Sequence, residues 1–162
     1  MIVVFGATGN IGPHLVRTLV SQGVRVRAVV RELTRARALL PAEVELVEGA
    51  LEQPESVKAA LERATQVFCG VGGPRGTPEL VEVECRLIDL AAAAGVQQYV
   101  KISGIDSHPD ARSKIQRIHG EIEVHLRRSG LGYTILRPSF FLQNLLGMSA
   151  AIRQGALPLP TG

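Results

Sequence analysis

The sequence of 162 residues has few cysteines, no long apolar run and no recognisable leader. Its two cysteines, Cys69 and Cys85, fit neither the ligand spacing of a metal site nor a disulfide framework, so we expect packed thiols in a reducing compartment. No apolar stretch approaches the roughly 20 residues that a membrane-spanning helix needs. The chain passes from Met1 directly into an apolar segment, without the charged lead and cleavage site of a signal peptide. We therefore expect a cytoplasmic protein without a metal site or a membrane partner.

The sequence also lacks a basic tail, a basic stripe and any low-complexity segment. Its formal net charge is +3 and its isoelectric point is about 9.2, but lysine and arginine are spread among 15 acidic residues. Nucleic-acid binding is therefore supported by the isoelectric point alone, and we do not expect a nucleic-acid partner. The 46% hydrophobic and 20% charged residues are typical of an ordered globular protein, and the length predicts one domain, residues 1–162.

Apolar patterns predict six strands that alternate with helices. We expect strands at residues 2–5, 24–30, 44–47, 67–71, 98–102 and 133–136. We expect helices at about residues 11–20, 34–40, 54–64, 78–94 and 110–129. Because helical crossovers between strands are right-handed and join parallel strands, this pattern predicts a doubly wound parallel sheet in three layers, the Rossmann α/β architecture with strand order 3-2-1-4-5-6. Ligands of such sheets bind at the carboxyl ends of the strands.

Three evenly spaced glycines, Gly6, Gly9 and Gly12, follow the first predicted strand. Gly6 permits the tight turn, Gly9 lets the backbone approach a pyrophosphate, and Gly12 lets the next helix lie close to the strand. That helix presents unpaired N–H groups and the positive end of its dipole to an anion. A purely structural turn is the alternative, but the context predicts a dinucleotide-binding loop. The loop residues expected to contact the dinucleotide are Gly6, Thr8, Gly9, Asn10, Ile11 and Gly12.

The loop Gly6-Ala7-Thr8-Gly9-Asn10-Ile11-Gly12 resembles the signature of the atypical short-chain dehydrogenase/reductases, and in particular of the NmrA-like family of NAD(P)-binding proteins. Residues 27–31 resemble the second strand of that family. Residues 133–141, together with Asn144, resemble its sixth strand and the segment that follows. The resemblance implies a nicotinamide dinucleotide cofactor and adds Pro138 to the expected cofactor contacts.

Arg31, at the end of the second predicted strand, occupies the position that discriminates NADP(H) from NAD(H). A carboxylate there accepts a hydrogen bond from the ribose 2′-hydroxyl, whereas an arginine attracts a 2′-phosphate. Arg31 therefore favours NADP(H), although Glu32 beside it argues for NAD(H) and Arg31 could serve only as a surface charge.

Two more loops are expected to contact the cofactor. After the third strand the family usually has an acidic residue following Gly49, whereas this chain has Ala50, so the backbone of Ala50 and Leu51 is expected to line an adenine pocket. After the fourth strand, Gly70-Val71-Gly72-Gly73 resembles the small-residue loop over which the ribose and pyrophosphate pass, with a flexible turn as the alternative. The expected contacts from these loops are Ala50, Leu51, Gly70, Val71 and Gly72.

The resemblance also implies where a catalytic site would lie. Short-chain dehydrogenases generally use a Tyr as acid, a Lys four residues later and a Ser at the end of the fifth strand. Ile115 occupies the Tyr position and His119 the Lys position, so the acid is missing. Ser103 and His119 are the candidate catalytic and cofactor-binding residues, Ser103 as a donor to a carbonyl or the nicotinamide and His119 as a ligand of the ribose. The alternatives are a strand-end cap for Ser103 and a surface histidine paired with Glu123 for His119.

Two functions remain open at this point. A quinone can accept hydride and then take its proton from water, so the missing acid permits an NAD(P)H-dependent oxidoreductase acting on a quinone or other small carbonyl, which is our first interpretation. A non-catalytic redox sensor that binds the cofactor is the second.

Residues 155–162 resemble the stretch that leads into a small C-terminal substrate-binding region, which we expect this chain to lack. A homodimer would cover the open site.

Overall fold

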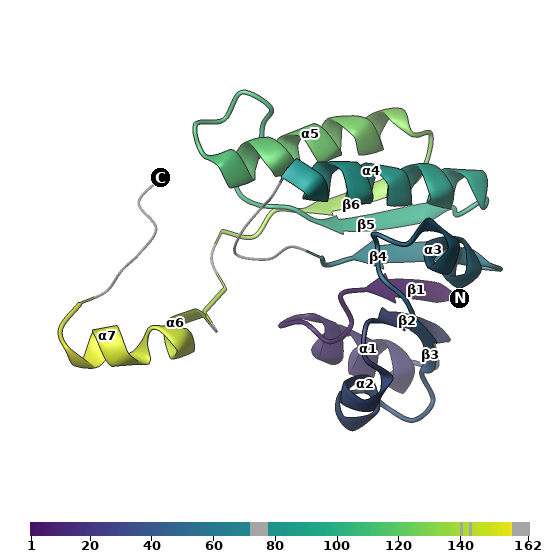
Figure 1. The fold of residues 1–162 in the computed structure, drawn as a ribbon, viewed down its shortest axis with the longest axis horizontal. Helices are drawn as coiled ribbons and strands as arrows, with labels where there is room; N and C mark the ends of the chain where they lie inside the picture. Colours follow the sequence, from purple (N-terminus) through teal and green to yellow (C-terminus); the bar gives the residue numbers. More distant parts are fainter. Residues whose placement is uncertain (72–77, 140, 143, 157–162) are drawn as a thin grey trace.

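The computed structural model describes residues 1–71, 78–139, 141–142 and 144–156, and its centre is a parallel sheet with helices on both faces (Figure 1). The strands in the described residues are β1 (Ile2–Phe5), β2 (Val26–Val30), β3 (Glu45–Glu48), β4 (Gln66–Cys69), β5 (Gln98–Ile102) and β6 (Gly132–Leu136). Their order is β3-β2-β1-β4-β5-β6, and every neighbouring pair is parallel. The predicted architecture and strand order are confirmed.

The described helices agree with the sequence patterns except at some ends. They are α1 (Gly12–Ser21), α2 (Leu33–Leu39), α3 (Pro54–Leu61), α4 (Pro78–Ala93), α5 (Lys114–Arg128), α6 (Asn144–Gly147) and α7 (Ser149–Arg153). The prediction that α5 begins at residue 110 is wrong, because residues 103–113 form a loop that folds over the helix. A side chain at Gly120 would overlap the backbone of His108 in that loop. The short helices α6 and α7 were not predicted.

Two apolar cores lie on the two faces of the sheet. All four residues of β1 are buried, with Val3 and Phe5 facing α3, α4 and α5, and Ile2 and Val4 facing α1 and α2. Each such side chain contributes about 1.5–3 kcal/mol of burial free energy. Double-sided burial explains why the first strand is a continuous apolar run rather than an alternating one.

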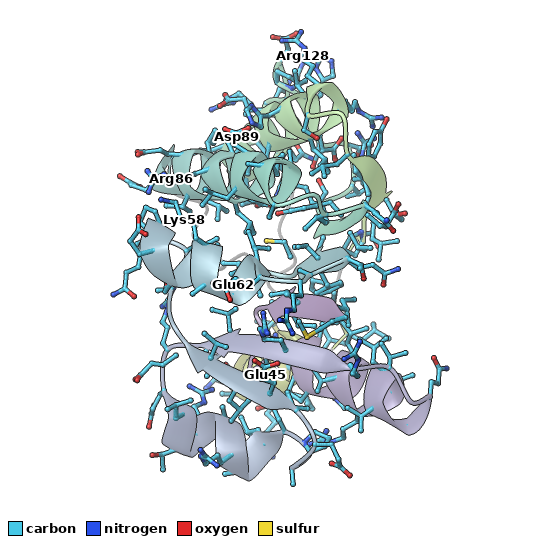
Figure 2. All side chains as sticks on the ribbon, turned by 90° about the vertical axis from the view of Figure 1, so that its right-hand side faces the viewer. Glu45, Lys58, Glu62, Arg86, Asp89 and Arg128 are labelled. Carbon is cyan, nitrogen blue, oxygen red and sulfur yellow. The ribbon has the colours of Figure 1, made fainter. Side chains whose placement is uncertain are left out.

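Arg27 on β2, beside the edge strand β3, joins three elements. Its Nη1 donates to the carbonyl oxygens of Ala60 at 2.7 Å and Glu62 at 2.8 Å, at the carboxyl end of α3. Its Nε lies 2.9 Å from the carboxylate of Glu45 on β3. Figure 2 shows Glu45 and Glu62 on the same side of the molecule. The cation therefore stabilises the negative end of α3 and attaches it to β2 and β3.

The opposite edge of the described sheet is more open. Tyr133 and Leu136 of β6 are exposed, and α6 and α7 extend away from the sheet (Figure 1). Leu142 and Leu146 on this segment are 73% and 76% exposed.

Cys69 is buried and Cys85 half-buried, both as free thiols. Within the ranges that the structure describes, no helix combines the length and the apolar character needed to cross a bilayer.

Candidate dinucleotide-binding site

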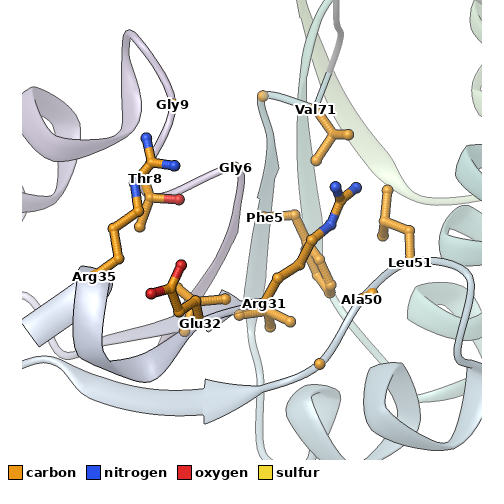
Figure 3. A pocket seen from close by; sticks show the side chains of 14 residues that line it. Phe5, Gly6, Thr8, Gly9, Arg31, Glu32, Arg35, Ala50, Leu51 and Val71 are labelled. Atoms are coloured by element: carbon orange, nitrogen blue, oxygen red, sulfur yellow. The ribbon is translucent and has the colours of Figure 1, made fainter.

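A cleft of about 470 Å³ opens at the carboxyl ends of β1, β2, β3 and β4 (Figure 3). It is lined by Phe5, Gly6, Thr8, Gly9, Val29, Val30, Arg31, Glu32, Arg35, Gly49, Ala50, Leu51, Gly70 and Val71. Loops far apart in the sequence meet here because parallel strands end at the same edge of the sheet. The cleft thus contains residues from all four loops that the sequence analysis singled out.

The expected cofactor contacts divide into three groups. Those that line the cleft are Gly6, Thr8, Gly9, Arg31, Ala50, Leu51, Gly70 and Val71. Those that do not line it are Asn10, Ile11, Gly12, Ser103, His119 and Pro138. Gly72 lies outside the described residues. The cleft therefore gathers most of the residues expected around the adenosine and pyrophosphate, but not Asn10, Ile11 and Gly12 of the glycine loop, and none of those expected around the nicotinamide.

The three glycines of the first loop have different surroundings. Gly6 has a φ of +85°, and a Cβ there would lie 2.8 Å from the carbonyl oxygen of Gly70 on the neighbouring loop. A Cβ on Gly12 would overlap the carbonyl oxygen of Gly6, so this glycine lets α1 approach the turn. A Cβ on Gly9 would meet only that same oxygen, at 3.3 Å, and would otherwise project into open space. Gly9 is the glycine whose missing side chain leaves room for a ligand.

The first turn of α1 is available to an anion. Ile11 occupies the N-cap position, where it makes no side-chain hydrogen bond to the helix, and a proline lies within the first two positions. The first N–H groups of a helix have no intrahelical acceptors. An oxyanion at the glycine loop would therefore receive hydrogen bonds from backbone N–H groups and the favourable end of the helix dipole.

Two arginines enter the cleft from opposite sides. Figure 3 shows Arg31 directed towards Leu51 and Val71, and Arg35 beside Thr8 and Gly9. Nη2 of Arg31 lies 3.6 Å from Oε1 of Glu52, and both side chains are largely exposed, so the pair is weak. Sequence reasoning missed Arg35, which lies in the first turn of α2 while Arg31 lies outside that helix, so no local pattern relates the two arginines. Glu32 lies between the arginines and adds one carboxylate to the rim.

The loop after β3 is held in place by a side chain of α3. The Ser56 hydroxyl donates to the carbonyl oxygen of Gln53 at 2.9 Å, and its oxygen lies 3.3 Å from the backbone N of Ala50. A Cβ on Gly49 would lie 2.7 Å from the same hydroxyl oxygen. Ser56 therefore holds Ala50 at the cleft wall, where Leu51 supplies a buried apolar surface.

Ser103 lies at the carboxyl end of β5 with its hydroxyl already engaged. The side chain is 5% exposed, and its hydroxyl donates to Oε1 of Glu123 on α5 at 2.6 Å. Nε of Arg137, just after β6, donates to the same oxygen at 2.9 Å, and its Nη2 donates to Oε2. Ser103 is thus part of a buried hydrogen-bonded group that connects β5, α5 and the end of β6.

His119 is buried rather than a surface residue, which removes one alternative. It is 8% exposed, and its Nδ1 has no hydrogen-bond partner in the described part of the chain. The carboxylate of Glu123, four residues later, is bound by Ser103 and Arg137 instead. Burial, with a smaller contribution from the charge of Lys101, lowers the pKa of His119 to about 4. The imidazole is therefore neutral near pH 7.

Neither tyrosine of the sequence lines the cleft. Tyr99 on β5 is fully buried in the core, and Tyr133 on β6 places its hydroxyl oxygen 3.1 Å from Nη1 of Arg127. Ile115 is in the first turn of α5. Neither tyrosine hydroxyl therefore lines the cleft, and position 115 carries an aliphatic side chain.

A buried ion pair between β5 and α4 was not found by sequence reasoning. Nζ of Lys101 lies 2.7 Å from Oε1 of Glu84 on α4, and both side chains are completely buried. Burial raises the pKa of Glu84, and the charge of Lys101 opposes that effect. In the sequence the lysine appears in a strand and the glutamate in an amphipathic helix, so nothing local indicates that they meet.

A family model described as NAD(P)H-binding matches residues 6–156. The chain belongs to this NAD(P)H-binding family. An NAD(P)H azoreductase from Xenophilus azovorans is 37% identical over 163 residues, covering 100% of this chain and 56% of the relative. Photosystem II assembly factor Ycf39 from Cyanophora paradoxa is 32% identical, covering 92% and 48%. The NAD(P)-binding resemblance inferred from the sequence is confirmed.

Solved structures give the same assignment of the fold. A triphenylmethane reductase from Citrobacter sp., complexed with NADP(H), superposes with a TM-score of 0.83 at 24% identity, covering 97% of this chain and 56% of that one. An NADPH-dependent quinone oxidoreductase from Escherichia coli, complexed with NADPH, gives 0.81 at 26% identity, covering 96% and 55%. This chain spans about half the length of the relatives that it matches.

Proposed function

We propose that the protein is an NADP(H)-dependent oxidoreductase that reduces a quinone or another small conjugated acceptor. The observation that carries the proposal is the cleft itself, in which a glycine loop with a free helix N-terminus lies beside two arginines. The proposed cofactor contacts are Gly6, Thr8, Gly9, Asn10, Ile11, Gly12, Arg31, Ala50, Leu51, Gly70, Val71 and Gly72, with Ser103, His119 and Pro138 at the nicotinamide end.

The described residues fit a phosphorylated dinucleotide. The space beside Gly9 and the uncapped start of α1 suit the pyrophosphate, and the apolar wall formed by Leu51 suits the adenine. Arg31 and Arg35 supply positive charge for a 2′-phosphate, whereas Glu32 would favour an unphosphorylated ribose. Because two guanidinium groups oppose one carboxylate, NADP(H) is the preferred form.

The proposed class of electron acceptor follows from the lack of an acidic proton on the two residues at the expected catalytic positions, Ile115 and His119. Bound NADPH would supply a hydride, which carries two electrons and one proton. His119 is uncharged near pH 7 and therefore lacks an acidic proton to donate, and the Ile115 side chain has none. A quinone needs none from the protein, because its reduced anion is stable enough to take a proton from water. The names of the azoreductase, quinone oxidoreductase and triphenylmethane reductase relatives support conjugated acceptors of this kind.

A sensor that binds the cofactor without turnover is the second candidate. Two observations favour it: Ser103 is engaged by Glu123, and assembly factors occur among the relatives. In that case Ser103 and His119 would contact the cofactor only.

The deciding experiment mixes the purified chain with NADPH and a panel of quinones, azo dyes, ketones and aldehydes, and follows absorbance at 340 nm. The reductase proposal requires oxidation of NADPH by conjugated acceptors, at rates that fall in Ser103→Ala or His119→Ala. Binding of NADPH without oxidation by any acceptor would favour the sensor. Fast ketone reduction would contradict both, because general acid assistance is worth about 10²- to 10⁴-fold and no acid has been identified.

Location and assembly are separate proposals. The free thiols of Cys69 and Cys85 support a reducing compartment such as the cytoplasm. The exposed apolar residues Leu136, Leu142 and Leu146 support self-association, with a homodimer as the simplest form. Sedimentation at several protein concentrations would separate monomer from dimer.

A further inference from the structure

Glu123 lies where β5, α5 and the end of β6 meet, and it is 2% exposed. Its Oε1 accepts hydrogen bonds from the Ser103 hydroxyl at 2.6 Å and from Nε of Arg137 at 2.9 Å. Nη2 of Arg137 donates to Oε2, and Nη2 of Arg127 lies 3.7 Å from that oxygen. The two-point contact with Arg137 is the arrangement in which a guanidinium binds an ionised carboxylate most strongly.

The ionised state of Glu123 determines where the single hydroxyl hydrogen of Ser103 points. Burial would raise the pKa of Glu123, but the hydrogen bonds from Arg137 and Ser103 outweigh it, and the pKa is lowered. A carboxylate accepts hydrogen bonds and donates none. The short contact between Ser103 and Glu123 is therefore made with the hydrogen of Ser103.

The neighbouring Ser107 does not donate a hydrogen bond to Ser103. Its hydroxyl oxygen lies 3.2 Å from that of Ser103, but its own hydrogen is donated to the carbonyl oxygen of Gly104 at 2.8 Å. On the backbone side, the N–H of Ser103 donates to the carbonyl oxygen of Leu136 at 2.8 Å. Ser103 is thus held at both its backbone and its side chain, and what its oxygen has left to offer is a lone pair.

We infer that Glu123 is a positioning residue that makes Ser103 a hydrogen-bond acceptor at the nicotinamide end of the proposed site, so that the group recognised there is an N–H donor of the carboxamide type. The inference rests on the proposed function and deepens it. A substrate carbonyl only accepts hydrogen bonds, so it is an unsuitable partner for a serine oriented in this way. Ser103 then orients the cofactor and leaves protonation of the product to water.

The test compares NADP⁺ with its 3-acetylpyridine analogue, in which a methyl group replaces the NH₂ of the carboxamide. By calorimetry, the wild-type chain is expected to bind NADP⁺ about fivefold more tightly than the analogue, the ratio that corresponds to a net hydrogen bond of ~1 kcal/mol. Ser103→Ala is expected to bring this ratio close to one by weakening NADP⁺ binding alone. Ser107→Ala, the matched control, is expected to leave the ratio unchanged.

Glu123→Gln tests the positioning role. A glutamine amide can donate to the Ser103 oxygen and release its hydrogen, so the ratio is expected to fall, whereas a merely loosened fold would weaken both ligands equally. If this variant does not fold by circular dichroism, the comparison of Ser103→Ala with Ser107→Ala still decides. An unchanged ratio in Ser103→Ala would overturn the inference and leave the proposed function standing. Failure of the wild-type chain to bind NADP⁺ at all would overturn both.

Discussion

The ammonium group of Lys101 lies 2.7 Å from the carboxylate of Glu84, and neither side chain has any exposed surface. The pair joins β5 to α4, two residues before Ser103 in the strand. Oε2 of Glu84 has no hydrogen-bond partner among the described residues. Each charge therefore depends on the other, because an ion buried alone is strongly destabilising.

Removing one partner of this pair should destabilise the fold more than removing both. Lys101→Met leaves Glu84 buried without a countercharge and is expected to lower the free energy of unfolding by about 3–5 kcal/mol. The double variant Glu84→Leu with Lys101→Met is expected to recover most of that loss, because hydrophobic replacement of a buried pair is often close to neutral. Urea unfolding of both variants measures the difference. A single variant as stable as the wild type would contradict the buried pair.

Charge reversal at the cleft should change the cofactor preference. A charge-assisted contact to the 2′-phosphate is worth about 1.5–3 kcal/mol, so NADPH should bind roughly tenfold or more tightly than NADH, and Arg31→Asp should reverse the order. Arg35→Asp is also expected to reduce the preference for NADPH over NADH, since Arg35 lines the same cleft. Arg37→Asp is the control, because Arg37 is exposed on α2 and does not line the cleft. Equal affinities for both cofactors in the wild type, by calorimetry, would refute the prediction.

Two glycines of the same loop should fail in different ways. Gly9→Val is expected to abolish cofactor binding with little loss of stability, because the side chain would project into the space reserved for the pyrophosphate. Gly12→Ala is expected to lower the thermal unfolding temperature in addition to weakening cofactor binding, because its Cβ would overlap the backbone of Gly6. Circular dichroism melts and fluorescence titration with NADPH would separate the two effects. Full NADPH binding by folded Gly9→Val would show that the pyrophosphate lies elsewhere.

His119 should make stability depend on pH on the acid side of neutrality. The unfolded chain protonates this histidine near pH 6.5, whereas the folded state keeps it neutral down to about pH 4. Unfolding therefore takes up a proton in this range, and stability should fall as the pH is lowered from 6.5 towards 4. His119→Gln is expected to remove that part of the decrease. NMR titration checks the cause, and a His119 resonance that titrates near pH 6.5 would contradict it.

The fold and the position of the glycine loop were determined by the sequence alone, because they depend on patterns among residues that are close together in the chain. The apolar run of β1, the spacing of its three following glycines and the alternation of strands with helices predicted the sheet, its strand order and a glycine loop that lines the cleft. Such patterns reflect local backbone geometry and the need to bury one or both faces of each element. Arg31 was found in the same way, since a position directly after a strand of known order has a known place at the sheet edge.

The tertiary structure alone decided which polar groups meet inside the fold. The start of α5 depends on the packing of residue His108 over Gly120, and the contacts of Ser103 with Glu123 and of Lys101 with Glu84 join residues 20 and 17 positions apart. In the sequence Lys101 looks like an ordinary strand residue, and Glu84 and Glu123 look like ordinary members of amphipathic helices. A carboxylate is tolerated in the interior only where a partner from another element compensates its desolvation, and that partner is specified by the packing of α4, α5 and β6 against β5 rather than by any local pattern.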